Sequence, residues 1–412
     1  MSLRTTHPPV AVTGLGLVTP AGIGEQPTWQ ALLAARTTAA RDPVLAGLPV
    51  DISCQVPDFD AHRLVGRHLA WRLDRAAAMA VLAARHATAD AGLSPAEWDA
   101  ARVGVVIGTG SASMERYDAE YAKLGAGRPL AISPLAVTRS VPNMPAAEIA
   151  LDLTARGPNF AVSTACASGT TALGVARDLL RAGTCDIVLA GGTESARCRM
   201  PAACFHRMGA LSQRLGQPAA ASRPFDADRD GFVLAEGAAV LVLERSEHAR
   251  ARGVRPRAYV AGYGASCDAH HFAAPDPEGR GAAAALRAAL RDAGLDPADI
   301  GHVNAHGTGT RLNDQAECEA LRSVFTAPPP VTSVKGALGH AMGAAGAIEA
   351  AVTVLSLQQG TVPPTANLDR QDPDIDLDVV TKVPRSITAM TAAASTSFAF
   401  GGQNAALVLH AA

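Results

Sequence analysis

Short apolar runs alternate along the chain with alanine-rich stretches of helical length. The runs are rich in valine, leucine and isoleucine and are bounded by glycine or polar residues, which is typical of buried strands. They lie at residues 10–16, 103–110, 159–165, 186–195, 238–244, 257–264, 302–310 and 404–410. The alanine-rich stretches lie at residues 74–91, 169–182, 281–293 and 344–358. Strands that alternate with helices predict an α/β fold built in layers.

Three stretches near strand ends have counterparts later in the chain, in the same order. The pairs are "VAVTGLG" (10–16) with "AYVAGYG" (258–264), "VVIGTG" (105–110) with "NAHGTG" (304–309), and "VSTACASG" (162–169) with "TSVKGALG" (332–339). The alternative is chance similarity between glycine-rich strand ends. A true repeat predicts two halves, residues 9–253 and 254–410, whose equivalent strand-end loops converge on one site.

The composition excludes several classes of protein. The net charge is −2, so no surface for binding polyanions is indicated. The chain contains no run of about 18 uncharged apolar residues, which argues against a membrane span. Its first 16 residues lack the pattern of a signal peptide. The seven cysteines are scattered without metal-binding spacing, so we expect free thiols, a cytoplasmic location and no zinc.

One cysteine stands where an apolar run meets a helical stretch. Cys166 follows the run 159–165 and precedes "ASGTTALGVARDLL". A free cysteine is often a small buried core residue. A helix N-terminus, however, carries partial positive charge and unpaired N–H groups, both of which stabilise a thiolate and the oxyanion of a tetrahedral adduct. The position therefore predicts a nucleophile whose pKa is lowered.

Two histidines and one lysine lie in the glycine-rich loops that the repeat places opposite Cys166. His306 is in "VNAHGTGTRLND", and Lys335 and His340 are in "SVKGALGHAMGAAGAIEA". Each histidine alone could be a core residue with its hydrogen bonds satisfied, and Lys335 could be a solvated surface residue. Together, two neutral imidazoles could donate N–H groups to one carbonyl oxygen, which suits a reaction that forms an enolate.

A further glycine-rich segment precedes the last apolar run. "TSFAFGGQNAALVL" (396–409) predicts a turn with unusual backbone angles around Phe398 and Phe400. One backbone N–H of this turn could complete an oxyanion hole. The alternative is a tight hairpin that leads into the final strand.

Together these motifs resemble those of the elongating β-ketoacyl-[acyl-carrier-protein] synthases, which are condensing enzymes of the thiolase superfamily. The resemblance runs from about residue 9 to 410. It is carried by "STACASG", "RPFDADRDGFVLAEGAAVLVLE", "NAHGTGT", "SVKGALGHAMGAAGAIE" and "FGGQN". It implies a thiolase fold of five layers, α-β-α-β-α, made of two pseudo-symmetric halves. The reaction implied is condensation of an acyl chain with malonyl units in fatty-acid or type II polyketide-like elongation.

The resemblance also implies roles for matching residues. Cys166 matches the nucleophile that carries the acyl chain as a thioester. His306 and His340 match the pair that drives malonyl decarboxylation and holds the enolate. Lys335 matches the lysine near the second histidine, and Glu349 matches its acidic neighbour. No cofactor is implied, because the substrates ride on the phosphopantetheine of acyl carrier protein.

Other matching residues belong to the substrate channel. The backbone N–H groups of Cys166 and Phe400 would form the oxyanion hole, and the Phe400 ring would act as a gate. Thr308 and Thr310 match the threonines that contact the phosphopantetheine arm. The full set expected to bind substrate is Thr308, Thr310, Phe398, Ser111, Gly401 and Gly402.

Three residues depart from the family pattern. Ala399 stands where glycine is usual at the gate, and alanine resists positive φ, so the hinge is expected to differ. Gln403 stands where threonine is common. Ser111 replaces a bulky aliphatic residue of the fatty-acid enzymes, which suggests an enlarged or altered acyl pocket.

The implied partners are acyl carrier protein and a second chain. The family forms dimers through a strand near the nucleophile, so we expect a homodimer or a heterodimer with a chain-length-factor-like subunit. No nucleic acid or membrane is expected as a partner. The candidate basic patch for the acidic carrier protein is Arg63, Arg67, Arg72, Arg75 and Arg207.

The motifs disfavour two other functions. A non-catalytic partner subunit would resemble the enzyme but lack its nucleophile, whereas this chain has Cys166, His306 and His340. A thiolase acting on coenzyme A would need a second cysteine in the C-terminal half. The candidates there, Cys267 and Cys318, lie outside the glycine-rich loops.

Overall fold

Ten strands form the framework of the fold, in two sets of five that share the same internal order. The computed structural model describes residues 9–111 and 114–412; residues 1–8, part of the segment searched for a signal peptide, lie outside it. The first set is β1 (Val10–Thr19), β5 (Val103–Gly108), β6 (Asn159–Val162), β7 (Ile187–Ser195) and β8 (Glu236–Arg245). The second is β9 (Ala258–Cys267), β10 (Ile300–Asn304), β11 (Val331–Thr332), β14 (Ala392–Ala399) and β15 (Gln403–Ala411).

The strand order shows the internal repeat directly. It runs β11-β10-β14-β15-β9-β1-β8-β7-β5-β6, so each half has the same order read from the middle outward. The pairing directions also match, because β5 is parallel to β6 and β7 as β10 is parallel to β11 and β14. The two sets meet where β1 pairs antiparallel with β9. The three pairs of similar sequence stretches therefore occupy equivalent positions.

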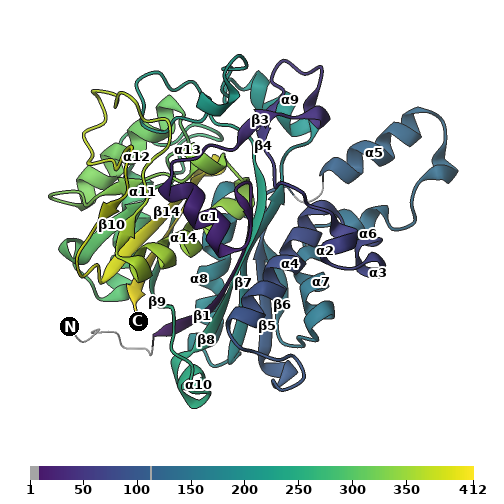
Figure 1. Ribbon diagram of the computed structural model, residues 1–412, viewed down its shortest axis with the longest axis horizontal. Helices are drawn as coiled ribbons and strands as arrows, with labels where there is room; N and C mark the ends of the chain where they lie inside the picture. Colours follow the sequence, from purple (N-terminus) through teal and green to yellow (C-terminus); the bar gives the residue numbers. More distant parts are fainter. Residues whose placement is uncertain (1–8, 112–113) are drawn as a thin grey trace.

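Helices cover the strands in layers (Figure 1). The helices are α1 (Glu25–Leu33), α2 (Ala61–Leu64), α3 (Arg67–Ala70), α4 (Arg75–Asp90), α5 (Met114–Gly125), α6 (Ala136–Ser140), α7 (Met144–Leu153), α8 (Ser168–Arg181), α9 (Arg199–Arg207), α10 (Ser246–Ala251), α11 (Arg280–Ala293), α12 (Arg311–Val324), α13 (Lys335–Leu338) and α14 (Ala345–Gln359). Short strands β2 (Gly22–Ile23), β3 (Ala39–Arg41), β4 (Ile52–Cys54), β12 (Thr361–Val362) and β13 (Arg385–Ser386) complete it.

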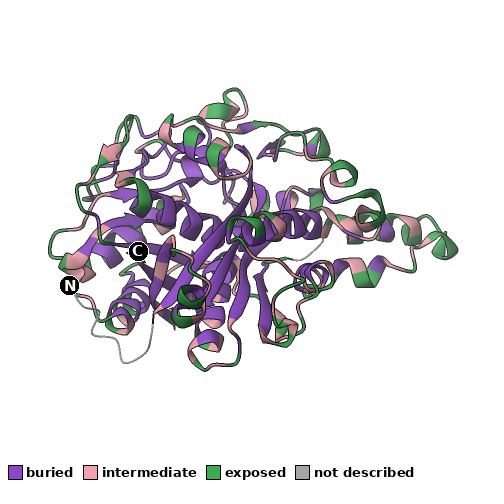
Figure 2. Cartoon of the chain, turned by 60° about the horizontal axis from the view of Figure 1, so that its bottom comes forward, coloured by how far each residue is buried: buried purple, intermediate pink, exposed green. Residues whose placement is uncertain are grey.

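The core shows why five layers form. On β8, Ala239, Leu241 and Leu243 face a central core that contains α8 and α14, whereas Ala238, Val240 and Val242 face an outer core with α4 and α7. On β15, Leu407 and Leu409 face the central core, and Ala406 and Val408 face a core with α11 and α12. Alternate side chains of one strand thus bury on opposite faces. The layers are α4/α7, first strand set, α8/α14, second strand set, α11/α12, as expected, and Figure 2 shows the buried interior.

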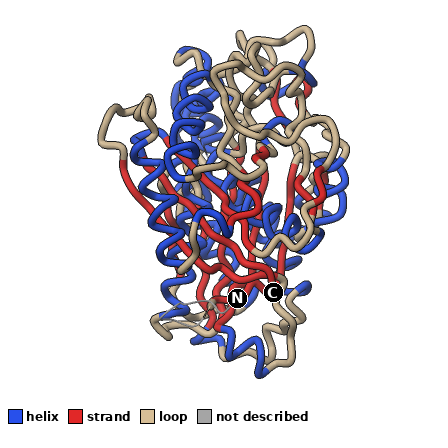
Figure 3. Tube along the Cα trace, turned by 90° about the vertical axis from the view of Figure 1, so that its left-hand side faces the viewer, coloured by secondary structure: helices blue, strands red, loops and turns tan. Residues whose placement is uncertain are grey.

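Most of the elements lie where the sequence predicts them. The stretches 74–91, 169–182, 281–293 and 344–358 are α4, α8, α11 and α14. The run at 302–310, however, ends as a strand at Asn304, because Gly307 and Gly309 take positive φ of 36° and 79°. Long loops gather at one end of the molecule, at the top of Figure 3, away from both termini.

Candidate active site

Cys166 lies at the joint between strand and helix that the sequence indicates. After β6 the chain forms a single 3₁₀ turn, Ala165–Ala167, and α8 begins at Ser168. Ala165 has a positive φ of 47°, a strained conformation for alanine that turns the chain sharply before the sulfur. Gly169 allows close packing here, since a Cβ on it would lie 2.6 Å from the backbone nitrogen of Ala347 on α14. The thiol is therefore held on a fixed backbone.

Two imidazole rings face the thiol. The Nε2 atom of His340 is 3.2 Å from Sγ of Cys166. The rings of His306 and His340 are 5.3 Å apart between centroids and nearly perpendicular. One ligand atom from each of the three residues lies within 4.8 Å of the others. Loops after β10 and α13 thus converge with the β6–α8 joint, as the repeat predicts.

A buried lysine supports the first imidazole from behind. Lys335 Nζ lies 3.4 Å from Nδ1 of His306 and also donates to the His306 carbonyl oxygen. The same ammonium group forms an ion pair with Glu349, and both side chains are 1% exposed. Lys335 is therefore not the solvated surface residue of the alternative interpretation. Its position fixes the ring of His306 and places a positive charge beside it.

Burial sets the protonation of the three groups. The pKa of each histidine lies well below its usual value, mainly because burial disfavours the imidazolium form and secondarily because Lys335 is near. Burial also raises the pKa of the Cys166 thiol to about 12, against a smaller lowering effect of Lys335. The expectation of a resting thiolate at the helix N-terminus is therefore wrong. The resting site holds a thiol next to two neutral rings, and the thiolate must form by proton transfer.

We expect alkylation of Cys166 by iodoacetamide to become faster with pH across the range 7–9. Because its raised pKa keeps the thiol protonated at neutral pH, the thiolate fraction rises roughly tenfold per pH unit. Peptide mass spectrometry would assign the adduct to Cys166 rather than to the exposed Cys204 or Cys267, with Cys166→Ala as the control. A plateau below pH 7 would contradict this and indicate a thiolate–imidazolium pair.

Two cavities meet at the sulfur. The entrance cavity, of about 690 Å³, is lined by Thr308, Thr310, Phe398 and both histidines. The inner pocket, of about 230 Å³, is lined by Ser111, Met114, Glu194, Met200 and Phe205. Cys166, Met342 and Phe400 line both. The Phe400 ring thus lies where the two spaces join, which is the position of a gate.

The turn that carries Phe400 joins β14 to β15. Gly401 and Gly402 have positive φ of 82° and 71°, which explains why glycine is needed at both. Ala399 is extended, with φ −138° and ψ 157°, so its Cβ causes no strain in this conformation. The segment is at once the predicted turn and the hairpin of the alternative interpretation, since β14 and β15 pair antiparallel.

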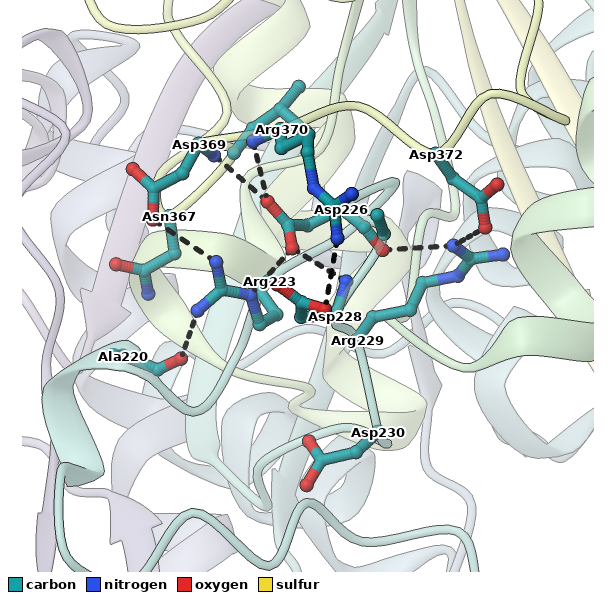
Figure 4. Close-up of polar contacts among 12 residues, drawn as sticks. Ala220, Arg223, Asp226, Asp228, Arg229, Asp230, Asn367, Asp369, Arg370 and Asp372 are labelled. Atoms are coloured by element: carbon teal, nitrogen blue, oxygen red, sulfur yellow. Dashed lines mark hydrogen bonds and ion pairs between the residues drawn. The ribbon is translucent and has the colours of Figure 1, made fainter.

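A buried carboxylate supports the loop of the two threonines. Asp314 accepts hydrogen bonds from the backbone N–H of Gly309, at 3.2 Å, and of Phe225, at 2.8 Å. Nε of Arg229 lies 3.3 Å from the same carboxylate. Arg229 also bonds to Asp372, in the network of Figure 4. The threonine loop at the entrance cavity is therefore fixed in place.

The "RPFDADRD" motif builds the rest of that network. Asp226 accepts hydrogen bonds from Nε of Arg223, at 2.9 Å, and from the backbone N–H groups of Asp369 and Arg370 (Figure 4). The motif thus ties its own loop to residues 369–372. Sequence reasoning used this motif only for the resemblance and gave it no role.

Sequence reasoning missed two buried glutamates beside the site. Glu317 accepts hydrogen bonds from the backbone N–H groups of His306 and Gly307, at 2.8 and 2.7 Å. Burial raises its pKa to about 7. Glu194 lines the inner pocket and is also fully buried. The available signal was an acidic residue within an apolar run, as in "DIVLAGGTES", where a charge is costly unless it is bonded.

The basic patch expected for carrier docking is only partly exposed. Arg63, Arg67 and Arg207 lie at the surface. Arg72 and Arg75 form ion pairs with the buried carboxylates of Glu148 and Glu236, at 2.7 and 2.6 Å. These two guanidinium groups already have ion-pair partners, so the exposed Arg63, Arg67 and Arg207 are the better candidates for docking.

The structure also places the two cysteines that were candidates for a thiolase reaction. Cys318 is buried on α12, and Cys267 is exposed at the end of β9, with its sulfur 3.7 Å from the Gly401 carbonyl oxygen. Neither lies with Cys166 in a cavity described above. Within residues 9–111 and 114–412, no helix is long and apolar enough to cross a bilayer.

Comparisons with known proteins agree with this geometry. Residues 7–249 match the family model "Beta-ketoacyl synthase, N-terminal domain", and residues 257–369 match "Beta-ketoacyl synthase, C-terminal domain". A 3-oxoacyl-[acyl-carrier-protein] synthase 2 of Vibrio cholerae is 39% identical, covering 97% of this chain and 98% of the relative. One of Synechocystis is 40% identical, covering 97% of both.

Solved structures have the same fold. The ishigamide ketosynthase/chain length factor superposes with a TM-score of 0.91 at 36% identity, covering 99% of this chain and 100% of the other. A type II polyketide ketosynthase in complex with its acyl-carrier protein gives a TM-score of 0.91 at 30% sequence identity, with the same coverage of both chains. The ketosynthase ApeO of Xenorhabdus doucetiae, in complex with its chain length factor, gives 0.83 at 27%, covering 98% of each chain.

Proposed function

Because the chain belongs to the beta-ketoacyl synthase family, we propose that Cys166, His306 and His340 carry out its condensation reaction. The chain is an acyltransferase that joins an acyl group to a malonyl-derived unit in fatty-acid or polyketide elongation. The observation that carries the assignment of residues is the thiol 3.2 Å from one imidazole and beside a second, at the junction of two cavities.

The first step is transfer of the acyl group to Cys166. The Cys166 proton passes to Nε2 of His340, and the sulfur attacks the thioester carbonyl of the acyl carrier. The new C–S bond forms as the bond to the pantetheine sulfur breaks, and the proton passes to that leaving thiolate. The N–H groups of Cys166 and Phe400 would hold the oxyanion of the tetrahedral intermediate.

The second step uses the neutral rings as donors. Malonyl carrier enters along the entrance cavity, and its C–C bond to the carboxylate breaks with release of carbon dioxide. The electron pair forms an enolate, whose oxygen accepts one hydrogen bond from an N–H group of each of His306 and His340. For this step His340 carries its proton on Nε2, the atom that accepted the Cys166 proton in the first step, so its tautomer changes between the two steps. The enolate carbon attacks the carbonyl carbon of the Cys166 thioester, the new C–C bond forms as the C–S bond breaks, and the released Cys166 thiolate takes up one proton from solvent water. Neutral imidazoles suit this step because each can donate one hydrogen bond to the developing charge.

Each cavity takes one part of the substrate. Thr308 and Thr310, whose hydroxyl oxygens are 2.9 Å apart, would contact the phosphopantetheine arm in the entrance cavity with Phe398. The inner pocket, with Ser111 in its wall, would hold the acyl chain. Gly401 and Gly402 would let Phe400 swing between the two spaces.

Acyl carrier protein is the proposed donor of both substrates. The type II polyketide relative was solved with its own carrier protein, which supports this class of partner. Arg207 is exposed and adjoins Met208, which lines the entrance cavity. With Arg63 and Arg67 it would bind the acidic carrier. No resident cofactor or metal is proposed, although the three donor atoms within 4.8 Å could bridge a cation. A cytoplasmic location remains a prediction.

A second ketosynthase-like chain is the proposed partner of the projecting arm. This arm, α5 to α6, extends away from the body in Figure 1 and carries Tyr121, Leu124, Leu130 and Val137 with 47–101% of their surface exposed. β6 is the last strand of the sheet order, so one of its edges is open. Two relatives are ketosynthases described with a chain length factor. The partner would be a second copy or a related subunit of that kind.

We expect Leu130→Glu combined with Val137→Glu to weaken assembly of the chain by at least tenfold, because both side chains would bury in the interface. Analytical ultracentrifugation would measure it, on the chain alone and after co-expression with a related subunit. The control is Leu312→Glu, an exposed leucine on α12 outside the arm. Equal assembly of both variants would contradict the proposal.

Loading of Cys166 tests the proposed function. Incubation with acyl carrier protein bearing an acyl chain should add the acyl mass to the peptide that contains Cys166. Subsequent malonyl carrier should remove this adduct and release a β-ketoacyl product. Labelling of another cysteine, or no labelling, would contradict the assignment.

A further inference from the structure

A fully buried carboxylate closes one side of the inner pocket. Glu194 is the penultimate residue of β7, has 0% of its surface exposed, and lines the pocket together with Cys166. Its Oε2 atom accepts hydrogen bonds from the backbone N–H groups of Gly110 (2.6 Å), Ser111 (3.2 Å) and Gly343 (3.3 Å). Its Oε1 atom accepts from the hydroxyl groups of Ser111 (2.9 Å) and Thr109 (3.3 Å).

These bonds join three segments that are far apart in the sequence. One is the loop after β5, which continues into the pocket wall at Ser111. Another is the 3₁₀ turn Met342–Ala344, whose first residue lies with its sulfur 3.9 Å from Sγ of Cys166. The third is β7 itself. The carboxylate therefore connects the wall of the pocket to a residue that touches the nucleophile.

The backbones around this carboxylate approach as closely as glycine permits. A Cβ built on Gly343 would lie 2.3 Å from the nitrogen of Gly110 and 2.8 Å from Oε2 of Glu194. A Cβ on Gly110 would lie 3.0 Å from the same oxygen. The Glu194 carboxylate thus lies against Gly110 and Gly343, two positions without side chains, where the two loops come closest. Loss of the carboxylate would leave three backbone N–H groups without their acceptor.

Burial of the Glu194 carboxylate costs free energy, and close packing alone does not explain why a carboxylate stands here. Burial raises the pKa of Glu194 to about 6, against the lowering effect of its hydrogen bonds. An apolar residue would avoid this desolvation cost but would leave the N–H groups unsatisfied. The mechanism above gives Glu194 no chemical step. Its geometry nevertheless fixes the distance between the pocket wall and the turn that carries Met342.

We propose that Glu194 is a positioning residue that sets the shape of the inner pocket and thereby determines which acyl chains load onto Cys166. The proposal rests on the function proposed above and concerns the acyl-thioester substrate of that same site. It acts through Ser111 on the pocket wall and through Met342 beside the sulfur. The chain preference of loading is the property that it controls.

The test compares loading of Cys166 by a short and a long acyl thioester, butanoyl and dodecanoyl pantetheine, in the full-length chain. Glu194→Ala is expected to change the ratio of the two loading rates by about tenfold or more, since a displacement of about 1 Å near reacting atoms can cost 10²-fold. Glu194→Gln keeps an oxygen in place for the N–H groups. The ratio of loading rates in Glu194→Gln should therefore stay within about threefold of the ratio in the unmodified chain.

The matched control is Glu244→Ala. Glu244 is also fully buried, but it lies on β8 and bonds to Thr13, His248 and Arg252. Its loss is expected to lower stability without changing the ratio. A second variant that alters the shape of the same pocket is Gly343→Ala, whose Cβ would push the turn away from Gly110. This variant should shift the ratio in the same way, and it decides the question if Glu194→Ala does not fold.

The outcomes separate the two proposals. An unmodified chain that does not load Cys166 would contradict the proposed function. A chain that loads normally, with ratios unchanged in Glu194→Ala and in folded Gly343→Ala, would overturn the inference about Glu194 alone. A change in the ratio that also appears in Glu244→Ala would overturn it as well, because general loss of stability would then be the cause.

Discussion

Replacement of Cys166 with glutamine is expected to abolish condensation, with a loss of about 10⁴-fold or more, while malonyl decarboxylation continues. Condensation needs the sulfur as the acceptor of the acyl chain. Decarboxylation needs only the enolate site of His306 and His340, and the contacts of His306 with Lys335 and Glu317 do not involve the sulfur. The β-ketoacyl product and the released carbon dioxide would be measured separately, by mass spectrometry and with labelled malonyl carrier.

The control for this variant is Cys185→Ala, which changes a buried core cysteine away from both cavities. It should keep both activities. Residual condensation by Cys166→Gln above background would show that another group carries the acyl chain. Loss of decarboxylation together with condensation would instead place the sulfur in the enolate step.

Replacement of Lys335 with methionine is expected to lower the free energy of unfolding by about 3–5 kcal/mol, because it leaves Glu349 buried without its cation. Condensation should fall as well, by about 10²-fold, since the ring of His306 loses the group that orients it. Urea unfolding at pH 7 would measure stability, and the rate of β-ketoacyl formation would measure activity.

The double variant Lys335→Met with Glu349→Gln separates the two effects. It removes the uncompensated charge, so we expect it to recover much of the stability but not the activity. Arg385→Met is the control for loss of an ion pair, because Arg385 and Asp378 pair at the surface and should contribute within about 1 kcal/mol. Recovery of activity by the double variant would show that Lys335 acts through stability alone.

Most secondary structure could be predicted because the local pattern and the tertiary fold agree. The apolar run at 186–195 forms β7, which is buried along its whole length, and its short length and β-branched residues favour a strand. The stretch 344–358 became α14, which is buried between two strand sets. The strand β14, by contrast, was not predicted, since "TAAASTSFA" has small residues without strong strand preference, and its pairing with β10 and β15 decides its structure.

The repeat, together with the family resemblance, predicted that Cys166, His306 and His340 converge, and the structure brings them together. If the two halves are a true repeat, loops after equivalent strands are expected to converge on one site, so the motifs indicated the site from the sequence. Their protonation did not follow in the same way. A helix N-terminus suggested a thiolate, but Cys166 is buried with the Met342 sulfur 3.9 Å from its own, and this burial raises the pKa of the thiol.

The amino-acid sequence by itself therefore determined the layered α/β fold, the duplicated halves and the residues that meet between them, because periodicity and motif order are local properties. Only the tertiary structure decided which charged side chains are buried or held in ion pairs and which are exposed. Arg72 and Arg75 looked like docking residues until their pairing with Glu148 and Glu236 placed them in the framework. Glu194 is a residue of a buried strand, and only the tertiary structure shows that backbone N–H groups of two distant loops meet at its carboxylate. Burial and pairing depend on what the rest of the chain brings near a residue, and no local pattern records that.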